Sequence, residues 1–289
     1  MGIPFGLASY LLPVPALPYV GPRYGDILVV ASIPIWCSGV IALVKRRPPP
    51  WGKWASALIV TVACRWFLTA FLRWKSFMPQ WAPFQWDERL ASAESWLHGG
   101  QPLGIRLLPM LTSPMVLYGL LWLYGHAMPV MVAVILWQVW ADDRRRAQQF
   151  ALAYVLTWIL LGVVVAGAFS SVGPIMLERL TGDTQFRPLL AALQAGGARD
   201  LLEAASSLWA WWIGAGASVI SAFPSLHVAM AALYVCAARG WVCWVFVAYT
   251  FTTFLGSVML GWHYAIDGYA AVLGVMLIWW LAGRLTAEA

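Results

Sequence analysis

His263 and Asp267 are the pair of side chains in this sequence whose types and spacing point most directly to chemistry. They are four residues apart, so on a helix they share one face and can touch. A carboxylate that accepts the Nδ1 proton of a histidine fixes the ring tautomer and leaves Nε2 available as a nucleophile or base. The same spacing also fits a structural hydrogen bond at a helix end, or two polar groups that line a water pocket. The pair alone leaves these interpretations open.

A second histidine, His227, follows the segment Ser221-Ala222-Phe223-Pro224-Ser225-Leu226. Pro224 and Ser225 suit the start of a helix, with Ser225 as its N-cap. A helix start favours an anion, because its N–H groups are free and the dipole is positive there. A histidine beside an anion can protonate a leaving oxygen. Alone, His227 would be explained as an interfacial histidine with satisfied hydrogen bonds, so the case for catalysis depends on both segments together.

The elements that must position these residues are membrane helices. Of the 289 residues, 62% are hydrophobic and 10% are charged, and the mean hydropathy is +0.74. A soluble domain would be about one-quarter charged. We therefore expect an all-α, polytopic integral membrane helix bundle. The net charge of +6 is explained by loop residues that set topology and meet anionic headgroups, and not by nucleic-acid binding.

A membrane span needs about 20 apolar residues. On that basis we predict seven spans, near residues 27–44, 54–72, 116–140, 150–169, 224–240, 241–260 and 264–283. Arg65 lies in the middle of the second, so that segment either faces a protein interior or a wet cavity, or lies at the interface and leaves six spans. We expect an irregular membrane-surface segment over 1–26, N-terminal helices over 27–149 with a surface helix near 86–98, and a catalytic core over 150–284.

Basic residues follow every second predicted span, at Lys45-Arg46-Arg47, at 144–146, at Arg239 and at Arg284. By the positive-inside rule these ends are cytoplasmic. Both histidine segments then open at the non-cytoplasmic face, which is periplasmic, extracellular or lumenal. The cysteines Cys37, Cys64, Cys236 and Cys243 all lie in apolar stretches without metal-ligand spacing, so we expect neither a metal nor a disulfide framework.

The segments Phe223-Pro224-Ser225-Leu226-His227 and His263-Tyr264-Ala265-Ile266-Asp267 resemble the second and third signature motifs of the type 2 phosphatidic acid phosphatase superfamily. The resemblance covers about 150–284 and implies a six-helix phosphatase-like core that needs no cofactor. It implies that His263 attacks phosphorus and forms a phosphohistidine, oriented by Asp267. His227 would protonate the leaving alkoxide, while Ser225 and the backbone at Leu226 would bind phosphoryl oxygens of a membrane-lipid substrate.

The sequence departs from the phosphatase motifs at several positions. The Ser-Arg pair before the third-motif histidine is replaced by Gly256 and Ser257, and Leu226 stands in place of a glycine. These features, with Gly173-Pro174 in the segment 169–174, are similar to the branch of inositol phosphorylceramide synthases and sphingomyelin synthases. A phosphodiester carries less charge than a phosphomonoester and needs fewer cations, which favours a lipid phosphotransferase. A phosphatase that uses water as acceptor is the alternative.

Some cations must still meet the phosphate, and the candidates are Arg179, Arg187 and Arg65, followed by Arg73 and Arg89. Two rival functions remain open at this point. Gly216-Ala217-Ser218 resembles part of an intramembrane serine protease loop, although the glycine after the serine is missing. A non-enzymatic transporter or scaffold could use His227, His263, Asp267 and Arg65 as a proton or ion path. The absence of an internal repeat weakens that alternative. The sequence indicates no oligomeric state.

Overall fold

The computed structural model describes residues 51–287, and every regular element in that range is a helix. The predicted segment 1–26, the predicted span 27–44 and Cys37 lie outside the described residues. The helices are α3 (Trp51–Ser76), α4 (Met78–Trp81), α5 (Asp87–Leu97), α6 (Leu103–Arg106), α7 (Leu108–Leu111), α8 (Pro114–Gly125), α9 (Ala127–Trp140), α10 (Arg144–Leu156), the π-helix η1 (Thr157–Val165), α11 (Ala166–Ala168), α12 (Pro174–Thr181), α13 (Arg187–Ala195), α14 (Arg199–Ala215), α15 (Leu226–Ala237), α16 (Trp241–Met259) and α17 (Ala265–Leu285).

The described residues form two compact units. The first comprises residues 51–74 and 125–147, in which Ala57 packs against Val132 and Leu136. The second comprises residues 75–124 and 148–287 and carries both histidine segments. The predicted organisation into an N-terminal helical region and a core over 150–284 stays a prediction.

The prediction of an all-helical membrane bundle is confirmed. Four helices among the described residues are long and apolar enough to cross a bilayer: Trp51–Trp81, Arg144–Ala168, Trp241–Met259 and Ala265–Leu285. The pair α8 and α9 passes the same test together, as one bent span. These spans correspond to five of the seven that the sequence predicts.

The predicted span 224–240 is shorter in the structure. It is the helix α15, whose 12 residues extend about 18 Å, against about 30 Å for the hydrocarbon core. Its apolar run is longer than the helix because residues 221–224 approach in an irregular conformation and Gly240 turns the chain with a φ of 61°. Most of α15 is buried, and the helix packs along α16 and α17. Its hydrophobicity therefore serves helix packing more than contact with lipid.

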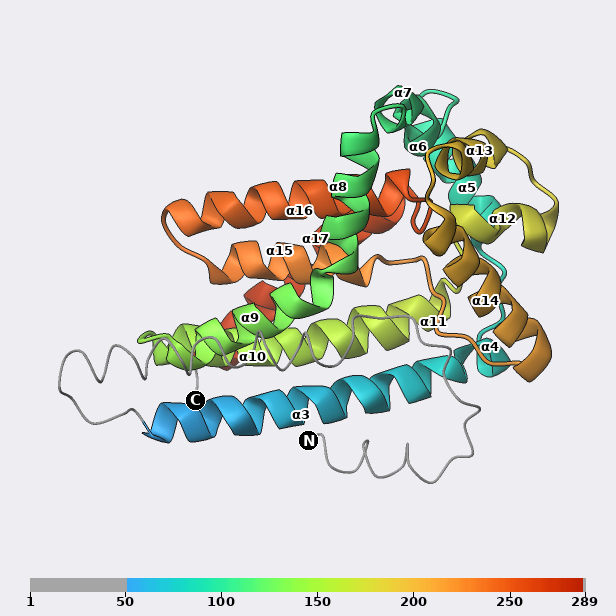
Figure 1. Ribbon diagram of the computed structural model, residues 1–289. Coiled ribbons are helices and arrows are strands. Elements are labelled where there is room, and N and C mark those ends of the chain that lie inside the picture. The colour runs from blue at the N-terminus through green and yellow to red at the C-terminus, as the bar shows by residue number, and fades with distance from the viewer. Residues whose placement is uncertain (1–50, 288–289) are drawn as a thin grey trace. The chain divides into compact units, whose positions relative to one another are not determined.

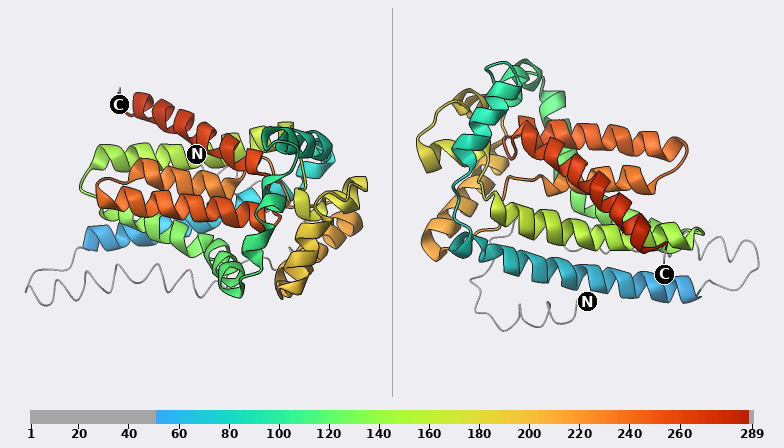
Figure 2. Two further views of the ribbon diagram at one scale, coloured as in Figure 1. Left: turned by 90° about the horizontal axis from the view of Figure 1, so that it is seen from above. Right: turned by 180° about the vertical axis from the view of Figure 1, so that it is seen from behind.

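Within the second unit, α15, α16 and α17 lie side by side, and the short helices α5, α12 and α13 gather at one end of them (Figure 1 and Figure 2). Helices α15 and α17 both begin at that end, whereas the turn at Arg239 and the end of α17 near Arg284 lie at the other (Figure 1). The two histidine segments therefore meet at the end of the bundle that the short helices cover.

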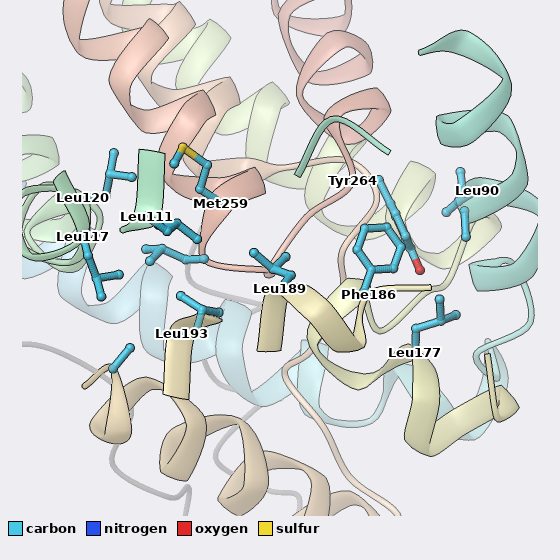
Figure 3. Close-up of a cluster of buried hydrophobic side chains, with 13 residues drawn as sticks. Leu90, Leu111, Leu117, Leu120, Leu177, Phe186, Leu189, Leu193, Met259 and Tyr264 are labelled. Atoms are coloured by element: carbon cyan, nitrogen blue, oxygen red, sulfur yellow. The ribbon is translucent and has the colours of Figure 1, made fainter. Parts of the chain in front are cut away.

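An apolar cluster joins these short helices to the loop between α16 and α17. Its labelled members in Figure 3 are Leu90, Leu111, Leu117, Leu120, Leu177, Phe186, Leu189, Leu193, Met259 and Tyr264. Tyr264 is almost fully buried and meets the ring of Phe186 edge-on at 5.8 Å. Because Tyr264 directly follows His263, close packing around its ring fixes the backbone at the histidine.

Candidate active site

His263 lies in the loop just before α17, and backbone groups hold it. Its Nδ1 is 2.6 Å from the carbonyl oxygen of Ala222, and its N–H donates to the carbonyl of Ser257 over 3.1 Å. A carbonyl can only accept, so Nδ1 carries the proton and Nε2 of the neutral ring keeps its lone pair. Burial lowers the pKa of His263 to about 4, the bond to Ala222 opposes that shift, and the charge of Lys75 adds to it. The ring is therefore neutral at pH 7.

Asp267 contacts His263 and also organises the start of α17. Its Oδ2 is 3.4 Å from His263 Nδ1 and accepts a hydrogen bond from the N–H of Tyr264 over 2.9 Å. This is the N3-to-N-cap bond of a capping box. Its backbone carbonyl accepts from the N–H of Ser225 over 3.2 Å. Asp267 thus joins the second motif to the third, and Ala222 is the closer partner of the His263 ring.

The second motif is built as a helix start. Ser225 is the N-cap of α15, and its Oγ accepts from the N–H of Val228 at 3.5 Å, while Leu226 is the first helical residue. His227 follows, and its Nδ1 lies 3.1 Å from the hydroxyl of Tyr124 on α8. The two rings are stacked, with centroids 4.3 Å apart. The structure therefore gives each histidine its own partner on Nδ1.

The loop 169–174 packs against both motifs. Ser171 accepts from the N–H of Ala222 through its carbonyl, over 2.9 Å, and from the N–H of Phe223 through its Oγ, over 3.1 Å. Gly173 has a φ of 85°, and a Cβ there would lie 2.4 Å from the carbonyl oxygen of Trp262. Only glycine can bring this loop so close to the backbone beside His263.

Two buried carboxylates of α5 hold these loops. Asp87 accepts from the N–H groups of Val172 and Gly173 and from the Tyr264 hydroxyl, over 2.9–3.1 Å. Burial raises the pKa of Asp87, and these hydrogen bonds lower it in part. Glu94 accepts from the N–H of Ile266 over 3.2 Å. The sequence predicts only a surface helix for this segment. Asp87 and Glu94 are seven residues apart, so they lie on one face of the helix, and that spacing could have identified them as a pair of functional residues.

Two of the predicted phosphate-binding arginines, Arg179 and Arg187, lie apart from these contacts. Arg179 is exposed and donates to Ser206 Oγ over 2.9 Å. Arg187 is exposed and forms an ion pair with Glu178, which lowers the pKa of that carboxyl. Arg65 lies in α3, in the first unit. Neither Arg179 nor Arg187 is joined to the histidines by a described contact.

Lys75 is a cation that the sequence analysis did not consider. Only 8% of it is exposed, and among the described lysines and arginines other than Arg65 it alone is buried. Its positive charge acts on both His263 and His227. The carbonyl of the next residue, Ser76, accepts from the N–H of Ser218 over 2.9 Å, in the segment that leads to the second motif. No local pattern marks Lys75, which lies in the last turn of the long apolar helix α3.

The position of the missing phosphatase arginine is buried and hydrogen-bonded in this chain. Ser257 is fully buried, its Oγ donates to the carbonyl of Phe254 over 2.8 Å, and its own carbonyl accepts from His263. At the preceding position, a Cβ on Gly256 would lie 3.5 Å from the ring of Tyr124. The departure from the phosphatase motif is therefore built into the packing.

Comparison with known protein families matches residues 88–281, two thirds of the chain, to the PAP2 superfamily. The chain belongs to the PAP2 superfamily. No curated protein and no solved structure matches it. As a PAP2 member with apolar helices, the protein is an integral membrane enzyme that acts on lipid phosphoesters as a phosphatase or a transferase. This membership confirms the superfamily that the motifs predict and replaces the protease and transporter alternatives, while the sphingolipid-transferase branch stays a prediction.

Proposed function

We propose that this PAP2 protein is a lipid phosphotransferase that works through a phosphohistidine at His263. The observation that carries the proposal is the bond from His263 Nδ1 to the Ala222 carbonyl. It leaves the Nε2 lone pair of a neutral ring as the nucleophile. Asp267 stabilises the positive charge that develops on the ring.

The reaction divides into two steps at one phosphorus atom. In the first, His227 acts in its charged form, with a proton on both ring nitrogens. His263 Nε2 bonds to phosphorus, the bond to the leaving alkoxide breaks, and His227 gives that oxygen its Nε2 proton. In the second, His227 takes the proton of an incoming hydroxyl, whose oxygen bonds to phosphorus while the bond to His263 breaks. Each histidine returns to its starting state.

The charge of the phosphoryl group needs donors beside the histidines. The first turn of α15, capped by Ser225, offers the N–H group of Leu226 and the positive end of the helix dipole. Lys75 is the cation that we assign to the phosphoryl oxygens, since it is buried and its charge acts on both histidines. Arg65, Arg179 and Arg187 remain the weaker candidates.

A phosphodiester substrate fits this set of donors better than a monoester. The phosphatase arginine is replaced by the buried Ser257, so one cation fewer surrounds the phosphate. Because a diester carries about one negative charge and a monoester nearly two, the loss is smaller for headgroup transfer. A phosphatase that uses water as the acceptor is the second candidate, on the basis of the superfamily.

The active site is proposed to face the non-cytoplasmic side of the membrane. Arg239 and Arg284 lie at the end of the α15–α17 bundle opposite to the starts of α15 and α17 (Figure 1). Short basic ends are retained in the cytoplasm. The histidine segments then open on the periplasmic, extracellular or lumenal side.

The experiment is a product analysis on the purified protein and its His263→Ala variant. Both receive phosphatidic acid, phosphatidylinositol and ceramide together, and mass spectrometry follows the lipids and free phosphate. Diacylglycerol with a new phospho-headgroup lipid and no free phosphate supports transfer. Free phosphate with diacylglycerol identifies a phosphatase instead. Equal turnover by the two proteins contradicts the histidine mechanism.

A further inference from the structure

Tyr124, at the end of α8, is the closest polar partner that the structure gives His227. Its hydroxyl lies 3.1 Å from His227 Nδ1, and the two rings stack at 4.3 Å with an interplanar angle of 27°. The contact joins residues 103 positions apart in the chain. A hydrogen bond and a ring stack together fix both the position and the rotation of the imidazole.

The ring of Tyr124 is itself held from behind. It faces Gly256 of α16, where an added Cβ would lie within 3.5 Å of the tyrosine ring. A Cβ at 256 would therefore be in van der Waals contact with the ring. Tyr124 therefore packs against a glycine, one residue before α8 ends at Gly125.

We infer that Tyr124 is a positioning residue that accepts a hydrogen bond from His227 Nδ1–H and thereby reserves Nε2 for proton transfer. The inference rests on the proposed function. With Nδ1–H bonded to the tyrosine oxygen, the neutral ring has its lone pair on Nε2 and the charged ring has its mobile proton there. One partner on Nδ1 thus serves both steps, in which Nε2 first gives a proton to the leaving oxygen and then takes one from the acceptor.

The two histidines are then held in the same way, through Nδ1, but by different partners. The ring of His263 is held through Nδ1 by a backbone carbonyl, whereas that of His227 is held by a tyrosine hydroxyl. Both ring orientations point Nε2 away from its anchor. The result is a nucleophile and a proton shuttle whose reactive atoms are the same nitrogen in each ring.

The test is Tyr124→Phe, which keeps the stacked ring and removes only the hydroxyl. We expect kcat to fall about ten- to a hundredfold with a lipid whose leaving group is an alkoxide, with KM little changed. With a phosphodiester whose leaving group is nitrophenolate, which departs without a proton, we expect the first step to be nearly unaffected. Tyr118→Phe on the same helix, where the side chain is exposed, is the matched control and should retain full activity.

A double-mutant comparison separates action through His227 from a general packing effect. In a His227→Ala background, Tyr124→Phe should cause no further loss with the alkoxide substrate, because the two residues act as one unit. Equal losses on both substrates, or an additive loss in the double variant, would mean a merely structural tyrosine and would overturn the inference. Wild-type kcat in Tyr124→Phe would overturn it as well.

A failure of the inference on Tyr124 can be distinguished from a failure of the proposed function by comparing the Tyr124→Phe and His263→Ala variants. If His263→Ala abolishes turnover while Tyr124→Phe behaves as wild type, the phosphohistidine proposal stands and only the inference on Tyr124 fails. If His263→Ala retains turnover, the proposed function itself fails.

Discussion

His263 Nδ1 lies 2.6 Å from the carbonyl oxygen of Ala222, 41 residues earlier in the chain. The acceptor belongs to the segment that also carries Ser225 and His227, so the second motif directly orients the histidine of the third, which is the proposed nucleophile. A backbone carbonyl cannot change its protonation state. The tautomer of His263 is therefore maintained by the fold, and the carboxylate of Asp267 at 3.4 Å is left to stabilise charge and to cap α17.

Asp267→Asn should lower kcat less than the corresponding change does in a catalytic triad where the aspartate alone fixes the histidine tautomer. There, the corresponding change costs about 10⁴ in kcat because the wrong tautomer forms. Here the Ala222 carbonyl preserves the tautomer, so we expect a loss of about ten- to a hundredfold, measured as kcat on a lipid substrate. A fall near 10⁴ would show that Asp267, and not Ala222, controls the ring.

The stability of the protein should depend on pH through His263. Its pKa is lowered from 6.5 to about 4 in the fold. Between these values the unfolded chain takes up a proton that the folded protein does not, so the free energy of unfolding falls as the pH drops from 6.5 to 4. The integrated loss is about 3 kcal/mol. Denaturation in detergent should show this loss in the wild type and a shallower dependence in His263→Gln. If the free energy of unfolding depends on pH equally in the wild type and in His263→Gln, the His263 ring is not buried in its neutral form.

Gly173→Ala should abolish activity. The added Cβ would lie 2.4 Å from the Trp262 carbonyl, next to His263, so either the loop 169–174 or the histidine must move. A misplacement of about 1 Å at a reacting group can cost about a hundredfold in rate. Gly182→Ala is the matched control, because its φ of 82° is equally strained but nothing lies near its Cβ. If both variants lose activity to the same extent, backbone strain and not the contact with Trp262 is the cause.

Lys75→Met should lower kcat by about 10²–10³-fold, the usual effect of removing one donor to a developing oxyanion. Lys75→Arg keeps the charge and should recover part of the rate. Lys53→Met, in the first unit, is the control for loss of a lysine and should leave the rate unchanged. Steady-state kinetics on an anionic diester lipid give the comparison. Full activity of Lys75→Met would exclude Lys75 as the phosphate-binding cation.

The helical membrane fold and the superfamily could be predicted from the sequence because both depend on local patterns. Apolar runs identify spans, and the Pro-Ser-Leu-His and His-Tyr-Ala-Ile-Asp segments each carry their signal within a few residues. The length of α15 was misjudged, since hydropathy continues past the point where Gly240 turns the chain.

The partners of the histidines were not predictable in the same way. Tyr124 contacts His227 from 103 positions earlier in the chain. Lys75, whose charge acts on both histidines, lies earlier still, and neither residue stands in a distinctive motif. Asp87 is similar, because its bonds to Val172, Gly173 and Tyr264 form only when the loops are folded. Arg187, in contrast, was a candidate from the sequence, and the structure pairs it with Glu178 at the surface.

The most direct test of the account is to trap the phosphoenzyme. Purified protein is mixed with a phosphorus-labelled lipid substrate, quenched in denaturant during turnover, and digested to locate the label. We predict a label that is stable to alkali, labile to acid and confined to the peptide that contains His263, and that is absent from His263→Ala. Label on another residue, or label that persists in His263→Ala, would contradict a phosphohistidine at this position.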